Sequence, residues 1–502
     1  MTDVRADIPA KYKWDLTAIY PDRAAFDADF TRAGALIAEI PAYEKTMTQS
    51  PEQLFALLEK TTQLDRLISK LYEYASLNSD VDKSDNTWLG LMGKVRDLAN
   101  DAGSASYFIS PALIRMNAKT LESWYASYPA LLAYRRNIEV EQRYQPYTLS
   151  NECEKLMADM SPALGTQYDL RAIFASADLK FGRITGPDGK KVQITDATYV
   201  PLLMSSDRRV RRAAFCKMYE TYAQFGNTFA AMMEGFVKER VTVARIRGFD
   251  NSLQASVFAD EVTPDIYNNL IDTVEKHLDV LFRYYDLKKE VLGVPQLHMY
   301  DLYTPLIASC TKEYTYEEAV NEVLDAVKVF GAEYHDTLSN GLLHEKWADV
   351  FPNRGKRSGA YSAGCYDTQP YILLNFNGTL DSVSTLAHEA GHSMHSYFSI
   401  KNNTPQQSQY KIFVAEVAST VNELIFSHKK LRESTSDEEK LSILNEIMET
   451  YKGTLYRQTM FAAFERDMHA LCTSGETLTQ ELLCDRYYEI VRRYFGPRVV
   501  CD

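Results

Sequence analysis

Apolar residues recur at steps of three and four along most of this chain. One clear run follows Pro51, and its repeating positions are Leu54, Leu57, Leu58, Leu64, Leu67, Ile68 and Leu71. The same spacing returns in five later segments, namely 215–246, 265–292, 316–339, 437–450 and 476–494. This is the period of an α-helix that buries one face. The pattern therefore predicts a mainly helical protein.

Two segments break the helical period. In the first, apolar residues at 179–184 and 192–194 flank a Gly-Pro-Asp-Gly run at 186–189, a pattern typical of a β-hairpin. In the second, the apolar run 371–376 precedes an Asn-Gly pair and predicts a strand ending in a turn. We divide the chain into an N-terminal helical region (1–110), a helical segment ending in the hairpin (111–200), and a C-terminal region (201–502).

The composition narrows the class of protein. Of 502 residues, 45% are hydrophobic and 25% charged, as in ordinary globular proteins, and no apolar run is long enough to span a membrane. The net charge of −13 argues against nucleic-acid binding. We interpret the short basic run 208–212 as a solvated helix face. The first residues do not resemble a signal peptide, and the seven cysteines never form Cys-x-x-Cys. We therefore expect free thiols and a cytoplasmic protein.

The decisive chemical motif is His388-Glu389-Ala390-Gly391-His392. Residues four apart lie on one helix face, so both imidazoles can bind one ion, and Glu389 lies close enough to reach a water on it. Zinc suits two imidazoles and a carboxylate with one position left for water. The motif arises by chance in a chain of this composition with a probability of roughly 0.01. It predicts a zinc site in which Glu389 accepts the proton of the attacking water.

Gly391 stands in the middle of the predicted metal helix. Glycine there costs about 1 kcal/mol relative to alanine, so we expect it to permit a close backbone approach, from the strand at 371–376. That strand either offers a free edge, to which an extended peptide substrate could add, or is fully paired within the fold.

A third ligand is expected from the apolar segment 412–426, whose only charged residues are Glu416 and Glu423. Such a helix predicts burial, and a buried carboxylate needs a cation or strong hydrogen bonds. The two glutamates are two turns apart on one stripe, so either could bind the metal while the other supports a ligand. His395, one turn beyond His392, is interpreted as a supporting or packed residue.

Several motifs together resemble the oligopeptidase F branch of the thimet oligopeptidase family. They are Gly359-Ala360-Tyr361-Ser362-Ala363-Gly364, the metal helix 386–395, Phe413–Thr420, Ala244–Phe249 and Tyr300–Tyr303. The resemblance implies one zinc ion per chain, bound by His388, His392 and Glu416. It also implies a two-lobed helical body whose deep channel admits short unstructured peptides, with a small β-sheet next to the zinc helix. Gly359 and Tyr361 in the first of these segments, together with Tyr371 of the predicted strand, are candidate substrate-binding residues.

The sequence thus predicts a zinc metalloendopeptidase for short peptides, either a monomer or a homodimer. A zinc carboxypeptidase of the same superfamily is the alternative enzyme. Members of the branch continue beyond the position matching Asp502 with a His and clustered Tyr motif that hydrogen-bonds the oxyanion, for which Tyr451 and Tyr456 are the available substitutes here. A third expectation is therefore a truncated form that binds zinc but has little activity.

Overall fold

The computed structural model describes residues 4–307 and 312–501, which form two compact units. Unit 1 comprises Met1–Pro146 and Thr311–Ser434, and unit 2 comprises Tyr147–Cys310 and Thr435–Asp502. Both are mainly helical with only small sheets, which confirms the predicted fold class. The three consecutive regions drawn from the sequence divide the chain at other points and stay a prediction.

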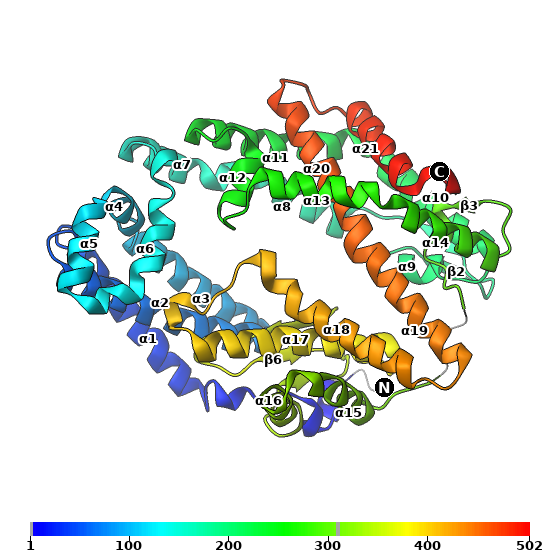
Figure 1. The fold of residues 1–502 in the computed structure, drawn as a ribbon, viewed down its shortest axis with the longest axis horizontal. Coiled ribbons are helices and arrows are strands. Elements are labelled where there is room, and N and C mark those ends of the chain that lie inside the picture. The colour runs from blue at the N-terminus through cyan, green and yellow to red at the C-terminus, as the bar shows by residue number, and fades with distance from the viewer. Residues whose placement is uncertain (1–3, 308–311, 502) are drawn as a thin grey trace. The chain divides into compact units, whose positions relative to one another are not determined.

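Unit 1 holds ten α-helices and one sheet among its described residues (Figure 1). Its helices are α1 (Arg23–Glu39), α2 (Pro51–Asp80), α3 (Asn86–Ala105), α4 (Ile109–Arg115), α5 (Ala118–Ser127), α6 (Arg135–Gln142), α15 (Tyr316–Val327), α16 (Ala332–Leu343), α17 (Leu380–Asn402) and α18 (Ile412–Glu433). The strands are β4 (Ala348–Asp349), β5 (Tyr361–Ala363) and β6 (Tyr371–Leu373). Serine, threonine, aspartate or asparagine caps several helix starts; Thr379, for example, accepts a hydrogen bond from the Ser382 amide at the start of α17.

The predicted strand is the centre of the unit 1 sheet. The order is β4-β6-β5, with β6 parallel to β4 and antiparallel to β5. Side chains alternate across β6: Tyr371 and Leu373 pack into a core formed largely by α1–α3, whereas Ile372 and Leu374 pack against α15–α17. Burial on both faces explains the continuous apolar run. Because β6 is paired on both sides, the fully paired alternative is correct for it. Within the described chain, β5 pairs with β6 alone.

Unit 2 is also built from helices. They are α7 (Asn151–Leu164), α8 (Thr166–Ile173), α9 (Asp196–Leu203), α10 (Arg208–Ala223), α11 (Gly226–Arg247), α12 (Ser252–Phe258), α13 (Pro264–Lys276), α14 (Leu278–Val291), α19 (Asp437–Thr450), α20 (Arg457–Thr473) and α21 (Gln480–Phe495), with π-helical segments at Phe174–Asp178 and Tyr451–Tyr456. The predicted hairpin is confirmed as β1 (Arg183–Thr185) paired antiparallel with β2 (Lys191–Gln193). A second pair joins β3 (Leu297–His298) to β7 (Val499–Val500).

The basic run at the start of α10 is only partly a solvated face. Arg211 is 3% exposed and donates to Oδ1 of the fully buried Asp301 at 2.8 Å, and Arg208 donates to Oδ2 of the same carboxylate at 2.8 Å. The interpretation as a solvated face is therefore wrong for these two residues. Their guanidinium groups instead form ion pairs with Asp301 in the Tyr300–Tyr303 segment.

Two further expectations concern thiols and membranes. Cys153, Cys216, Cys365, Cys472, Cys484 and Cys501 are free thiols, and Cys310 lies outside the described residues. None of the helices in the described ranges combines the length and the apolar character that crossing a membrane requires.

Candidate metal centre

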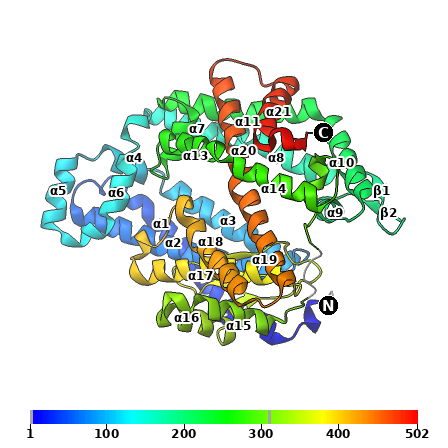
Figure 2. The ribbon, with the colours of Figure 1, turned by 45° about the vertical axis from the view of Figure 1, so that its right-hand side comes forward.

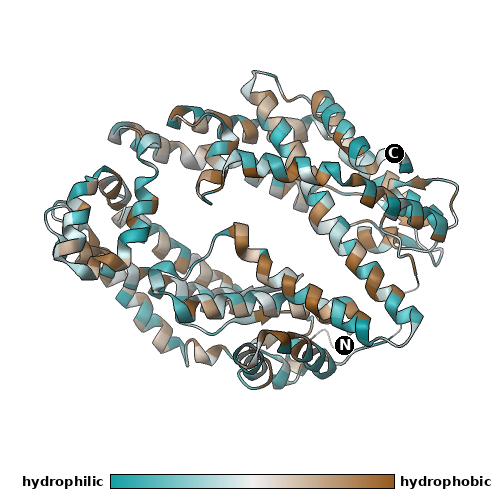
Figure 3. Ribbon diagram, viewed as in Figure 1, coloured by the Kyte–Doolittle hydropathy of each residue, from teal (hydrophilic) through white to brown (hydrophobic). Residues whose placement is uncertain are grey.

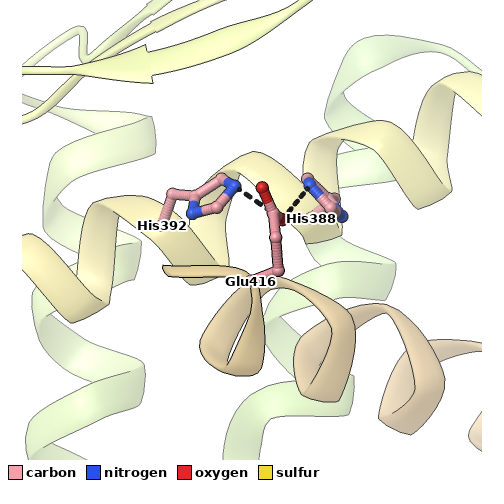
Figure 4. Close-up of side chains that lie close together, drawn as sticks. All are labelled: His388, His392 and Glu416. Carbon is pink, nitrogen blue, oxygen red and sulfur yellow. Dashed lines mark ion pairs between the residues drawn. The ribbon is translucent and has the colours of Figure 1, made fainter. Parts of the chain in front are cut away.

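The histidines of the predicted motif face one carboxylate from a neighbouring helix (Figure 4). His388 and His392 lie one turn apart on α17, and Glu416 lies in the second turn of α18. Oε2 of Glu416 is 3.3 Å from Nε2 of His388 and 3.3 Å from Nε2 of His392. Within residues 4–307 and 312–501, no other group of three or more His, Cys, Asp or Glu side chains brings its ligand atoms within 4.8 Å of one another.

These separations fit a metal ion. Zinc binds imidazole nitrogen and carboxylate oxygen at about 2.0–2.2 Å, so two ligand atoms at a tetrahedral angle are roughly 3.4 Å apart. The two observed nitrogen–oxygen distances of 3.3 Å match that value. Two neutral imidazoles and one carboxylate are also a donor set that suits zinc. The harder ions Mg²⁺ and Ca²⁺ favour sites made of oxygen ligands alone.

Gly391 permits the close contact between the two helices. A Cβ atom on Gly391 would lie 2.7 Å from the backbone oxygen of Ala418 and 2.7 Å from Cα of Ser419. The close approach expected at this glycine is confirmed, but the expected partner is wrong, because α18 and not the strand at 371–376 fills the space. The two helices run side by side in both views (Figures 1 and 2). Gly391 therefore brings Glu416 to the histidines.

Polar side chains on α18 contact the candidate ligands and their helix. Glu423 lies on the other side of the His388 ring, with Oε2 3.2 Å from Nδ1. Ser419, which is fully buried, donates its hydroxyl to Oε2 of Glu416 at 2.7 Å. Asn422, 1% exposed, donates to the carbonyl of Ala387 at 3.2 Å and so ties α18 to α17. The sequence analysis missed Ser419 and Asn422; their polar side chains within an apolar segment are the signal that could have found them.

The electrostatics of the site suit proton transfer. Burial raises the pKa of Glu389 to about 7, with Glu416 adding to the effect and His388 opposing it. Burial acts to lower the pKa of His388, but Glu423, Glu389 and Glu416 outweigh it, so this pKa is raised. Burial lowers the pKa of His392, against the attraction of Glu416. Glu389 is 7% exposed, and its Oε2 has no hydrogen-bond partner within the described chain.

The predicted burial of the segment 412–426 is wrong. Ile412 is 73% exposed, Phe413 62% and Val417 58%, while Glu416 is itself 62% exposed. Figure 3 shows the hydrophobic residues at the start of α18. The Glu416 carboxylate is thus solvent-exposed while it contacts the two imidazoles and the Ser419 hydroxyl, and it is not enclosed in a buried core. The burial argument gave the right segment for an incorrect reason.

The remaining candidate residues support the fold around the site. Tyr371 has no exposed surface and donates its hydroxyl to the carbonyl of Asp15 at 3.2 Å. Tyr361 donates its hydroxyl to Asp80 of α2 at 2.7 Å. The Gly359 carbonyl accepts a hydrogen bond from Asn375 at 2.7 Å. These hydrogen bonds of the three residues are thus with parts of unit 1 other than the two histidines.

His395 does not join the ligand set either. Its ring stacks on Tyr410 with centroids 3.7 Å apart and an interplanar angle of 14°, and its Nδ1 is buried without a hydrogen-bond partner in the described chain. Burial lowers its pKa. Tyr451 and Tyr456 belong to unit 2, where Tyr456 donates its hydroxyl to the carbonyl of His277 at 3.2 Å.

Comparison with known proteins places this geometry in a family. The family model described as peptidase family M3 matches residues 202–502, which include all three candidate ligands. The chain belongs to peptidase family M3. A second model, described as oligopeptidase F, matches residues 113–181. As a member of family M3 the protein is a metallopeptidase, and the resemblance seen in its motifs is confirmed.

Individual relatives agree with the family. The chain is 36% identical over 498 residues to oligopeptidase PepF of Bacillus subtilis, covering 99% of this chain and 74% of that protein. It is 34% identical to group B oligopeptidase PepB of Streptococcus agalactiae, covering 99% of this chain and 82% of PepB. The crystal structure of oligoendopeptidase-F from Enterococcus faecium has a TM-score of 0.73 at 30% identity and covers 95% of this chain and 80% of that one.

Proposed function

We propose that this M3 peptidase uses one zinc ion, held by His388, His392 and Glu416, to hydrolyse internal bonds of short unstructured peptides. The observation that carries the proposal is the meeting of three ligand atoms beside a buried glutamate with a free oxygen. The substrate class rests on the relatives, which are named as oligopeptidases and oligoendopeptidases.

Each residue has a distinct role in this proposal. Zinc supplies a Lewis acid that acidifies water and polarises the scissile carbonyl. Glu389 accepts the proton of the attacking water on its free Oε2 and then donates it to the leaving nitrogen. Its buried carboxylate lies beside the candidate ligands, where a general base within reach of the attacking water is required. Glu423 orients His388 by accepting from Nδ1.

Strand β5 is the proposed site for the peptide backbone. It is the sheet edge nearest to α17 in unit 1, and in the described chain it has one paired side. An extended peptide can add to such an edge through main-chain hydrogen bonds, with little dependence on its sequence. This assigns to β5 the role first considered for the strand at 371–376.

The proposal is tested by metal removal and one substitution. Chelation should abolish cleavage of an internally quenched peptide, and one equivalent of zinc should restore it. Glu389→Gln should lower kcat by roughly 10²–10⁴-fold while the protein still binds one zinc ion. A variant that cleaves at the wild-type rate would refute the assigned role, and cleavage that survives complete metal removal would refute the metal mechanism.

Peptides with blocked ends separate the alternatives. An endopeptidase should cut acetylated and amidated peptides at internal bonds, whereas a carboxypeptidase fails on an amidated C-terminus. A form that binds zinc without turnover should cleave none of a graded length series, so Glu389→Gln would change nothing measurable. The same series tests the expected limit on peptide length.

A further inference from the structure

Strand β5 has β6 along one edge and the metal helix against one face. On one side it pairs with β6, with Tyr361 opposite Leu373 and Ala363 opposite Tyr371. The amide of Ile372 donates to the carbonyl of Trp347, on the β4 side of β6. The β6 residues whose peptide groups point toward β5 are therefore Tyr371 and Leu373. In an antiparallel pair, hydrogen-bonded and non-bonded pairs alternate. The peptide groups of Ser362 therefore point away from β6.

The metal helix lies against the face of β5 that carries the Ser362 side chain. The hydroxyl oxygens of Ser362 and Ser393 are 2.8 Å apart, which joins the strand to α17. Ser393 lies one turn after Glu389, is fully buried, and donates its hydroxyl to the Glu389 carbonyl at 3.0 Å. A serine hydroxyl has a single proton to donate. Because Ser393 uses its proton on Glu389, Ser362 is the donor of the pair.

The same strand also reaches the Glu389 carboxylate. The backbone N–H of Ser362 acts against the rise of the Glu389 pKa, which places it on the side of the strand that faces this carboxylate. The Oε2 atom of this carboxylate has no hydrogen-bond partner in the described chain. The carboxylate thus faces β5 with one oxygen left for the proton of water.

We propose that Ser362 and Ser393 are positioning residues for the proton transfer. Their hydroxyl pair fixes β5 on α17, so that the Ser362 amide holds the Glu389 carboxylate in one orientation. Neither hydroxyl touches the metal ligands, so the pair acts on Glu389 and not on metal binding. The expected effect on kcat rests on the proposed function. The expected effect on the attachment of β5 to α17 rests only on the contact between the two serines.

The catalytic test compares Ser362→Ala and Ser393→Ala with the wild type. Both should lower kcat by roughly 10–100-fold, as loss of an orienting contact does, while the zinc dissociation constant changes less than about twofold. Ser362→Thr keeps the hydroxyl and should recover most of kcat. Ser399→Ala is the matched control, because its hydroxyl joins α17 to the carbonyl of Ser408 and not to β5; it should keep the wild-type kcat.

The structural test needs no activity. Amide hydrogen exchange at 361–363 should be faster in Ser393→Ala and in Glu389→Ala than in the wild type, and unchanged in Ser399→Ala. If the wild type cleaves no peptide, the proposed function fails. The exchange rates at 361–363 still show whether the serine pair holds β5 on α17. Exchange and kcat at wild-type levels in both Ser362→Ala and Ser393→Ala would overturn the inference, as would a loss of kcat that Ser362→Thr does not recover.

Discussion

Replacing Gly391 by alanine should weaken metal binding although no ligand is changed. The added Cβ would lie 2.7 Å from the Ala418 oxygen and from Cα of Ser419, whereas ordinary carbon contacts are about 3.5–4.0 Å. Both obstructing atoms are on or attached to the α18 backbone, so no side-chain rotation relieves the contact. The helix that carries Glu416 must move away from α17 by about 1 Å.

Such a shift exceeds what a zinc site tolerates. Metal–ligand distances hold within about 0.2 Å, so a displacement of about 1 Å detaches Glu416 or distorts its side chain. We expect zinc affinity to fall at least about 10-fold, by comparison with the loss of an orienting residue. The effect on folding is smaller, because the helix preference of alanine returns about 1 kcal/mol against an overpacking cost of about 1–3 kcal/mol.

The assay is a competition titration with a chromophoric zinc chelator, combined with urea unfolding of the metal-free protein. Gly93→Ala is the matched control, since Gly93 is also inside a helix of unit 1 but has no atom within 4 Å of a Cβ. The control should bind zinc normally. Its free energy of unfolding should exceed that of the wild type by about 0.5–1 kcal/mol. Wild-type zinc affinity in Gly391→Ala would refute the argument that this glycine sets the position of Glu416.

Three further substitutions test other parts of the molecule. Glu423→Ala removes the partner of Nδ1 of His388 and should weaken zinc binding roughly 10–100-fold in the same titration; an unchanged dissociation constant contradicts the orienting role. Glu73 is 7% exposed, and burial raises its pKa to about 7 from 4.5. The stability that its protonated form contributes is fully present below pH 4.5 and is lost as the pH rises through 7. The free energy of unfolding should fall by up to roughly 3 kcal/mol over this range. Urea unfolding from pH 4.5 to 8 should show a shallower decline for Glu73→Gln, and equal slopes would exclude this role. Asp301→Ala leaves the buried Arg211 without its carboxylate and should cost about 3–5 kcal/mol in urea unfolding at pH 7, whereas a loss below about 1 kcal/mol would show that the pair is dispensable.

The helices and the meeting of the two histidines could be predicted because both depend on local spacing. A period of three to four apolar residues is a property of one helix, and so is the meeting of two side chains four residues apart. The partner of Gly391 could not be predicted in the same way. The glycine indicates that some backbone comes close, but only the packing of the unit decides that it is α18 and not the nearby strand.

The two glutamates of α18 mark where sequence reasoning from burial ends. Hydrophobic neighbours suggested that both carboxylates were buried, yet Glu416 is 62% exposed and Glu423 19%. What distinguishes them is which part of α17 each one faces. Glu416 faces the Nε2 atoms of both histidines, and Glu423, two turns later on α18, faces Nδ1 of His388. A helix packed beside a metal helix can therefore supply a ligand and its orienting carboxylate from one stripe, seven residues apart. This assignment follows from the distance that Gly391 sets between the helices, and it fails if that distance changes.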